Sequence, residues 1–269
     1  MRSVKLIATD MDETLLTSDK HVPEEFYKLV SQLDHVGVVT AIASGRPLYT
    51  LKAQFPDLPL AFIADNGGVV EFHGELIHQA RLKTEDYQKM INFTLQQTAG
   101  IPILCGLNSA YIPKIFEASL NHLKYFYSEI KAVEDFENLT LAADKFTVYF
   151  PDKSSRTAYS TIFRKPFEHD YSVQVSGSEW IDFMPLGTDK GITIKYLGSA
   201  LGISPDQMMA FGDAENDIPM LTVVEKSYVV ANAIPEMFQY GKYKANTNDQ
   251  HGVTEIMSQV LNSQGEANE

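Results

Sequence analysis

Two carboxylates one residue apart, Asp10 and Asp12, follow a short apolar segment near the start of the chain. That segment, residues 4–9 (VKLIAT), is typical of a buried β-strand. Carboxylates at the end of a buried strand are costly unless a divalent cation or a catalytic role compensates for the lost solvation. The pattern therefore indicates a metal-binding or catalytic site, although a solvated loop that begins with an Asx-turn would show the same residues.

A serine follows a second apolar segment. Residues 36–43 (VGVVTAIA) lead into Ser44, Gly45, Arg46 and Pro47. Gly45 permits close approach of the backbone to a ligand, and Pro47 suits the first position of a helix. A hydroxyl and free N–H groups at the start of a helix can bind a phosphate oxygen. The alternative is an ordinary strand-to-helix turn that Ser44 caps.

A lysine stands where a helix is expected to begin. Thr188 and Asp189 suit the positive end of a helix dipole, whereas Lys190, which precedes an amphipathic segment at 191–201, opposes it. The opposition costs about 0.3–1 kcal/mol unless an anion lies close by. Lys190 is therefore a candidate phosphate ligand, and a solvated surface lysine is the alternative.

Another apolar segment, residues 208–212 (MMAFG), ends at Asp213 and is followed by Asn216 and Asp217. In open parallel sheets, ligands gather beyond the carboxyl ends of the strands. Asp213 and Asp10 should therefore face the same crevice. Asp217 falls in the first turn of the next predicted helix, where an acid is favourable on dipole grounds alone, so its role could be purely structural.

These residues together indicate a site for both a cation and an anion. The acids at the strand ends require a cation, whereas Ser44, Gly45 and Lys190 suit an anion. A magnesium ion that bridges a phosphoryl group would satisfy both requirements. In an extended Asp-x-Asp segment the two side chains lean to the same face, which leaves the Met11 N–H to bind a phosphate oxygen.

The elements that must position these residues alternate along both ends of the chain. Near-continuous apolar runs suit parallel strands that are buried on both faces, and amphipathic segments at 23–35 and 191–201 predict helices between them. The expected strands are residues 4–9, 36–44, 60–64, 208–212 and 227–231. The sequence thus predicts an α/β protein whose core is a doubly wound parallel sheet, similar to a Rossmann fold.

The middle of the chain has a different pattern. A hairpin is expected at 69–77 with its turn at His73-Gly74, before a region of mixed helical and alternating segments. Helices are expected at 84–98, 115–129 and 154–163, and strands at 145–150, 172–176 and 180–185. We therefore predict a discontinuous core domain, residues 1–82 and 187–269, interrupted by an inserted α+β cap domain, residues 83–186.

Composition excludes several function classes. The chain has 269 residues and a net charge of −13, which argues against nucleic-acid binding and against anionic membranes because no basic stripe is present. The single cysteine excludes an internal disulfide and a cysteine-rich metal site. No segment approaches the roughly 20 apolar residues of a membrane span, and we expect a cytoplasmic protein.

The order of these motifs resembles the haloacid dehalogenase superfamily, and more closely its Cof-type branch of sugar and nucleotide phosphatases. The segments that carry the resemblance are Asp10-x-Asp12-x-Thr14, Ser44-Gly45-Arg46, Asp189-Lys190-Gly191 and Gly212-Asp213-x-x-Asn216-Asp217, with Asp65-Asn66-Gly67-Gly68 and Asn248-x-x-x-Gly252-Val253 beside them. One residue departs from the pattern. Glu13 stands where that branch usually has glycine, and an extra carboxylate there would weaken phosphate binding unless it points to solvent or pairs with a cap residue.

The resemblance implies a magnesium-dependent phosphatase that hydrolyses small phosphorylated metabolites, either sugar phosphates or nucleotides, through an aspartyl-phosphate. It implies that Asp10 is the nucleophile, that Asp12 is the general acid and base, that Thr14 holds Asp12, and that Lys190 offsets repulsion of the phosphate. A phosphosugar mutase and a non-enzymatic, magnesium-dependent phospho-sensor are the alternatives.

The resemblance also assigns ligands. It implies that Mg²⁺ is bound by Asp10, the backbone carbonyl of Asp12, and Asp213, with Asp217 behind them. It implies that the phosphoryl oxygens and the substrate are bound by Met11, Ser44, Gly45, Lys190 and Asn216. Arg46 either contacts the substrate or pairs with a neighbouring acid.

Overall fold

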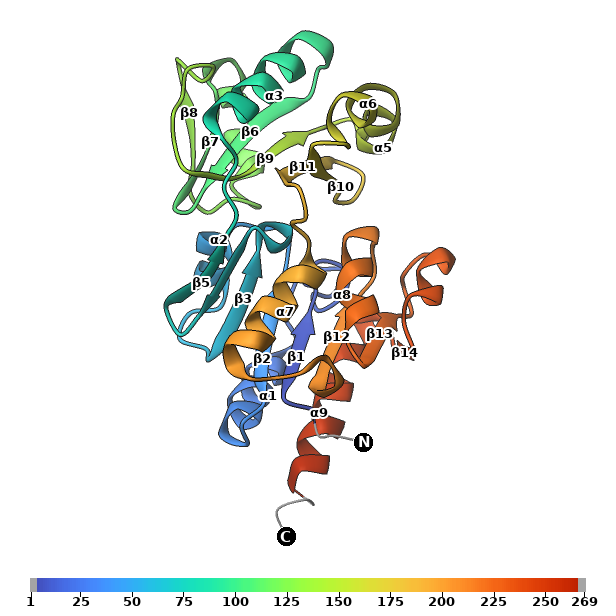
Figure 1. Cartoon of the computed structure of the whole chain (residues 1–269). Helices are drawn as coiled ribbons and strands as arrows, with labels where there is room; N and C mark the ends of the chain where they lie inside the picture. Colours follow the sequence, from blue (N-terminus) through green and yellow to red (C-terminus); the bar gives the residue numbers. More distant parts are fainter. Residues whose placement is uncertain (1–3, 266–269) are drawn as a thin grey trace. The chain divides into compact units, whose positions relative to one another are not determined.

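The computed structural model describes residues 4–265, and contacts within the chain group them into two units (Figure 1). The first unit runs up to Ser44 and continues with Phe55–His78 and the chain from Asp189 onward. The second unit comprises Gly45–Gln54 and Gln79–Thr188. The division into a core of 1–82 with 187–269 and a cap of 83–186 stays a prediction. The segment Gly45–Gln54, which that division places in the core, shares its contacts with the inserted segment.

The first unit is built on an eight-stranded sheet, in the order β14-β13-β12-β1-β2-β3-β4-β5. The strands from β14 to β3 run parallel, and β4 pairs antiparallel with β3. Their bounds are β1 (Leu6–Thr9), β2 (Val39–Ala43), β3 (Leu60–Ala64), β4 (Val69–Phe72), β5 (Glu75–Gln79), β12 (Met208–Gly212), β13 (Lys226–Val230) and β14 (Tyr243–Ala245). The predicted doubly wound sheet is confirmed, as is the hairpin β4–β5, whose turn residues His73 and Gly74 both have positive φ.

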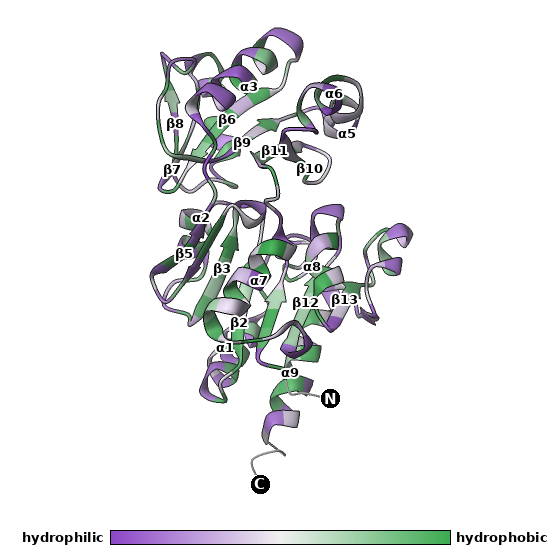
Figure 2. Cartoon of the chain, in the orientation of Figure 1, coloured by the Kyte–Doolittle hydropathy of each residue, from purple (hydrophilic) through white to green (hydrophobic). Residues whose placement is uncertain are grey.

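A row of four alanines crosses the middle of this sheet in register. Ala210, Ala8, Ala41 and Ala61 are paired from strand to strand and fully buried. They belong to the same hydrophobic cluster as Ile194 and Leu197, which come from the helix Lys190–Leu201. Small side chains in the sheet let a helix approach closely, so the alanine row sets the depth at which that helix lies. The apolar strands of this unit are coloured as hydrophobic in Figure 2.

Helices cover both faces of this sheet. On one side, α7 (Lys190–Leu201) packs against α8 (Ile218–Val223). On the other, α1 (Glu24–His35) packs against α9 (Gly252–Gly265). Helix α1 buries Phe26, Leu29, Val30 and Leu33, the i, i+3, i+4, i+7 spacing of an amphipathic helix. Within residues 4–265, no helix has the length and hydropathy that a membrane crossing requires.

The second unit contains a six-stranded, mostly antiparallel sheet, in the order β10-β11-β9-β6-β7-β8. Only the pair β7–β8 among those described is parallel. The strands are β6 (Ile101–Gly106), β7 (Ser109–Pro113), β8 (Ile130–Val133), β9 (Ala143–Tyr149), β10 (Tyr171–Val175) and β11 (Trp180–Pro185). The helices are α2 (Leu48–Gln54), α3 (Thr84–Gln97), α4 (Leu120–Leu123), α5 (Ser155–Ala158) and α6 (Arg164–Phe167).

One helix prediction in this unit is wrong in extent. Residues 115–129 contain only a 3₁₀ segment (Lys114–Ser119) and the single turn α4, because the chain after α4 turns so that Phe126 packs edge-on against Trp180. The helix predicted at 154–163 is confirmed, since α5 continues through a π-helical segment, Tyr159–Phe163, directly into α6. Strands β6, β7 and β8 were not expected as strands. Tertiary packing here overrides local helical periodicity.

We expect Gly67→Ala to destabilise the protein by about 2–4 kcal/mol, because Gly67 has a φ of +100° and a Cβ there would lie 2.5 Å from the Asp189 carbonyl oxygen. Gly74→Ala is the matched control, since Gly74 also has a positive φ but a Cβ added to it would have nothing within 4 Å. It should cost only about 1 kcal/mol. Urea unfolding of the two variants measures both losses, and equal losses would contradict a role for close packing at Gly67.

Candidate active site

Four neighbouring parallel strands end at the residues that the sequence singled out. Asp213 follows β12, Asp10 follows β1, Ser44 follows β2 and Asp65 follows β3. The strand order changes direction between β1 and β12, because the chain builds outward from β1 through β2 and β3, and later from β12 through β13 and β14. Crevices at such a switch point, beyond the carboxyl ends of the strands, are where open α/β sheets bind ligands.

Lys190 is buried at the centre of this edge. Its side chain is 0% exposed, and Nζ donates to Oδ1 of Asp10 at 2.6 Å and to Oδ1 of Asp217 at 2.7 Å. The helix dipole at the start of α7 opposes a lysine there, and these two carboxylates outweigh it. Lys190 is thus not a solvated surface lysine. Burial alone would lower the pKa of its ammonium group, but attraction to Asp10 and Asp217 raises that pKa above its ordinary value.

Asp217 connects the end of β12 to Lys190. While Oδ1 receives the lysine, Oδ2 accepts from the backbone N–H groups of Asp213 at 3.1 Å and Ala214 at 3.2 Å. This carboxylate is 0% exposed. Gly212 makes room for it, since a Cβ at that position would lie 2.5 Å from the Asp217 Cβ. Asp217 therefore has a structural role, and it also adds a buried negative charge to the site.

Asp213 is held by Thr14, 199 residues earlier in the chain. The Thr14 hydroxyl donates to Oδ1 of Asp213 at 2.9 Å. We expected Thr14 to hold Asp12, but a hydroxyl has one proton to donate, and in this structure it goes to Asp213. The hydrogen bond ties the loop after β1 to the loop after β12 and fixes the orientation of the Asp213 carboxylate.

Carboxylate oxygens of Asp10, Asp213 and Asp217 lie within 4.8 Å of one another. Burial raises the pKa of Asp10 well above its ordinary value, repulsion from Asp217 and Asp213 adds to the rise, and Lys190 opposes it. Burial also raises the pKa of Asp213 to about 7, again with repulsion from Asp217. In both groups, repulsion between the carboxylates adds to the effect of burial, and only one lysine, Lys190, pairs with the cluster. Hard oxygen ligands and uncompensated charge are what a divalent cation such as Mg²⁺ requires, so these three residues could hold one.

Ser44 and Asn216 are linked through Asn66, a residue to which the sequence assigned no role. The Asn66 backbone N–H donates to the Ser44 carbonyl at 3.0 Å, and its Oδ1 accepts from Nδ2 of Asn216 at 3.0 Å. Asn66 is fully buried and has a φ of +55° in the 3₁₀ turn after β3. Asparagine tolerates this left-handed conformation better than most residues. The Asp-Asn-Gly-Gly segment was the only signal that could have pointed to it.

Gly45 and Arg46 make contacts within the second unit. Nζ of Lys145 donates to the Gly45 carbonyl at 2.6 Å, and the Arg46 guanidinium lies 5.1 Å from the centre of the Tyr125 ring. Lys145 also lies 3.5 Å from Oδ1 of Asp182 in a buried ion pair. The segment that follows the Ser44 strand end is thus anchored to the inserted unit by a buried lysine and a cation–π contact.

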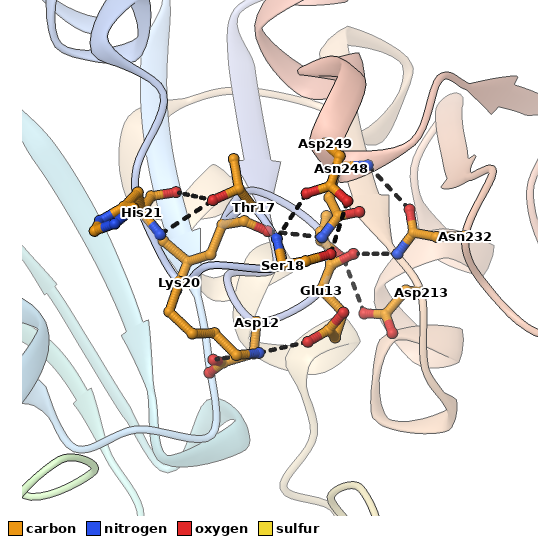
Figure 3. Close-up of polar contacts among 12 residues, drawn as sticks. Asp12, Glu13, Thr17, Ser18, Lys20, His21, Asp213, Asn232, Asn248 and Asp249 are labelled. Carbon is orange, nitrogen blue, oxygen red and sulfur yellow. Dashed lines mark hydrogen bonds and ion pairs between the residues drawn. The ribbon is translucent and has the colours of Figure 1, made fainter.

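The loop after β1 carries Met11 and Asp12. Met11 is fully buried, and its carbonyl accepts from the N–H groups of Leu15 and Leu16. The Asp12 side chain is 38% exposed, and its Oδ1 lies 3.9 Å from Nζ of Lys20. Glu13 forms an ion pair with the same lysine. The charge of Glu13 is therefore matched within its own loop rather than by a cap residue (Figure 3).

Residues from the C-terminal part of the chain form hydrogen bonds with this loop. Asn232 donates to the Glu13 carbonyl at 2.7 Å, and Asn248 donates to the Leu16 carbonyl at 2.9 Å. Asp249 accepts from both the N–H and the hydroxyl of Ser18 at 2.7 Å (Figure 3). In the sequence, the segment that begins at Asn248 is notable only through its family resemblance, and no pattern singles out Asn232 or Lys20.

Comparison with known proteins agrees with this arrangement. The sequence profile of the haloacid dehalogenase-like hydrolases matches residues 7–257. The 5-amino-6-(5-phospho-D-ribitylamino)uracil phosphatase YbjI of Escherichia coli (strain K12) is 29% identical over 263 residues, which cover 96% of this chain and 97% of that protein. The HMP-PP phosphatase of the same organism is 25% identical over 236 residues, 87% of this chain and 86% of its own.

A solved structure shows the same similarity in three dimensions. The crystal structure of SMU.1108c from Streptococcus mutans UA159 superposes with a TM-score of 0.88 at 28% identity, covering 96% of this chain and 99% of that one. The family profile spans every strand-end residue described above, from Asp10 to Asp217. The chain therefore belongs to the haloacid dehalogenase-like hydrolases, and its relatives identify it as an enzyme of the phosphoric monoester hydrolase class.

Proposed function

We propose that this enzyme is a magnesium-dependent phosphatase that hydrolyses small phosphorylated metabolites through an aspartyl-phosphate intermediate. The observation that carries the proposal is the cluster of Asp10, Asp213 and Asp217, two of which are paired with the buried ammonium group of Lys190. Such a cluster suits a cation on its acidic side and an anion on its lysine side. A phosphate ester with a divalent cation brings both.

Asp10 is the nucleophile in this proposal. One of its oxygens is held by Lys190, which fixes the carboxylate and reduces its repulsion of an approaching phosphate. A bond forms between a carboxylate oxygen of Asp10 and phosphorus, and the bond from phosphorus to the leaving oxygen breaks. Asp12 gives its proton to that leaving oxygen.

Hydrolysis of the intermediate uses the same acid in its other form. Asp12 takes a proton from water as that water attacks phosphorus, and the bond between phosphorus and Asp10 breaks to release inorganic phosphate. Asp10, the Asp12 carbonyl and Asp213, with Asp217 behind them, would hold Mg²⁺, which would supply positive charge to stabilise the phosphoryl oxygens. The Met11 and Gly45 N–H groups, Ser44 and Asn216 are the proposed phosphoryl ligands, and Arg46 is a proposed substrate contact.

The substrate class follows from the relatives. One acts on a phosphorylated ribitylaminouracil by its name, and the other is named for HMP-PP. We propose that this enzyme likewise takes a small phosphorylated metabolite, either a sugar phosphate or a nucleotide. Release of inorganic phosphate from a panel of such compounds with Mg²⁺ tests this directly. A mutase would return an isomeric phosphate ester, and a phospho-sensor would be phosphorylated on Asp10 without turnover, so either outcome would overturn the proposal.

Removal of divalent cations should abolish turnover, because the acidic cluster would then repel a phosphate dianion. We expect excess EDTA to reduce phosphate release to background and added Mg²⁺ to restore it. Ca²⁺, which is larger and more flexible in its coordination, should restore little activity. Full activity in the presence of EDTA would contradict the metal assignment.

Asp10→Asn should lower kcat by at least about 10³-fold, because an amide oxygen is a poor nucleophile. The same change should raise the stability of the metal-free protein, since it removes one of three crowded carboxylates and leaves Lys190 paired with Asp217. Asp34→Asn is the matched control, because Asp34 is exposed on α1 and is not one of the three clustered acids. Phosphate release and thermal unfolding measure the two effects. If Asp10→Asn turned over at a near-native rate, the nucleophile would have to be another residue.

The metal-free protein should lose stability as pH rises. The pKa of Asp213 is about 7 in the folded protein and 3.8 in its ordinary state, so the folded protein binds more protons between those values. The contribution of Asp213 to the free energy of unfolding is fully present below pH 4. It is lost as pH rises through 7, by up to about 4 kcal/mol. Asp213→Asn should flatten this part of the profile, and excess Mg²⁺ should restore stability at pH 8. Urea unfolding between pH 5 and 8 measures the slope, and an unchanged slope in the variant would contradict the assignment to Asp213.

A further inference from the structure

The loop from Met11 to His21 holds an ion pair between two residues of unusual backbone conformation. Glu13 has a φ of 61° and Lys20 a φ of 63°, values that residues with a Cβ adopt rarely. Lys20 Nζ donates to Oε1 of Glu13 (Figure 3). Strained residues persist only where the surroundings hold them in place, and they gather at functional sites.

The backbone on both sides of this pair is fixed. Asn232 donates to the Glu13 carbonyl at 2.7 Å. The turn that contains Lys20 is closed by a hydrogen bond from its N–H to the Thr17 carbonyl at 2.8 Å and by one from the Thr17 N–H to the His21 carbonyl at 3.0 Å. Asp249 anchors Ser18 within the same turn. The turn therefore delivers the lysine to one place, and the position of its ammonium group does not depend on side-chain rotamers alone.

The ammonium group lies between two carboxylates. Besides its hydrogen bond to Glu13, Nζ of Lys20 is 3.9 Å from Oδ1 of Asp12. Lys20 and Asp12 are both about a third exposed, so the pair contributes little to stability. Two left-handed residues and a network of loop hydrogen bonds are thus maintained for a weak surface pair. Because the ion pair itself contributes little to stability, the way the loop holds Lys20 favours a role for this lysine at the neighbouring Asp12.

We propose that Lys20 is a positioning residue for Asp12, and that Glu13 holds Lys20 in place. The ammonium group restricts the directions in which the Asp12 carboxyl group points, so that it meets the leaving oxygen at the rim of the site. This inference rests on the proposed function, in which Asp12 gives a proton to the leaving oxygen while the Asp10–phosphorus bond forms and the ester bond breaks. Glu13 then supports the position of Asp12 indirectly, because it holds the lysine.

A comparison of leaving groups tests the proposal. An alkyl phosphate needs a proton on its leaving oxygen, whereas p-nitrophenyl phosphate releases nitrophenolate without one. The quantity to compare is kcat/KM, because it reports on the steps up to departure of the leaving group. We expect Lys20→Met to lower kcat/KM about 10-fold for the sugar phosphate that the wild-type enzyme hydrolyses fastest, and less than about 3-fold for p-nitrophenyl phosphate. Lys20→Arg should retain most of the activity on both.

Removal of Glu13 separates two explanations of that loss. If Lys20 acts on Asp12, the variant that combines Lys20→Met with Glu13→Gly should keep the loss on the sugar phosphate. If Lys20 only neutralises Glu13, the combined variant should recover full activity on both substrates. That recovery, or equal losses of Lys20→Met on the two substrates, would overturn the proposal.

Two controls keep the test decisive. Lys242→Met removes one partner of another exposed ion pair of the first unit, that with Glu225 at 2.9 Å, and should leave both rates unchanged. Thermal unfolding checks that Lys20→Met is folded, and Lys20→Gln replaces it if it is not. A wild-type enzyme that releases phosphate from neither substrate would overturn the proposed function itself. A wild-type enzyme active on both, with no preference in the Lys20 variants, would overturn only the role of Lys20.

Discussion

The ammonium group of Lys190 between Asp10 and Asp217 is the interaction on which the arrangement of the site depends. A buried lysine is stable only when paired, and a buried carboxylate likewise, so the two ion pairs must form together. They bring the start of α7, the end of β1 and the turn after β12 to one point. The alanine row beneath α7 and the missing side chain at Gly212 are the packing conditions that allow this approach. Removal of Lys190 would leave both buried carboxylates without compensation.

The same cluster is left with excess negative charge, and the chemistry follows from that excess. With all three carboxylates ionised, Lys190 offsets only one of them. Burial raises the pKa values of Asp10 and Asp213, and repulsion between the carboxylates raises them further. The folded protein thus keeps uncompensated negative charge in this site, which a bound cation would offset. Crowded carboxylates of this kind lower the stability of the fold, so they are expected at positions that serve binding or catalysis.

The loop that carries Asp12 is held in a different way, by hydrogen bonds from distant parts of the chain rather than by buried ion pairs. Asn232, Asn248 and Asp249 reach it from more than 200 residues away. Lys20 and Glu13 complete the loop from within. The Asp10 side of the site is therefore held by buried ion pairs, whereas the loop of Asp12 is held by hydrogen bonds and an exposed ion pair. Gly45 and Arg46 are held by yet another set of contacts, within the inserted unit.

The sequence alone determined the elements whose signal is local. Uninterrupted apolar runs identified β1, β2, β3 and β12, and the acids that end them fell on one sheet edge because parallel strands share a direction. It could not show that Thr14 bonds Asp213, that Asn66 joins Ser44 to Asn216, or that Lys20 pairs with Glu13. Those contacts depend on left-handed turns and on partners brought together across the chain, and no residue pattern encodes them. Residues 115–129 failed as a helix for the same reason, since packing of Phe126 on Trp180 decided their conformation. Local periodicity fixes which face of a segment is apolar, whereas only the folded chain decides which side chains meet.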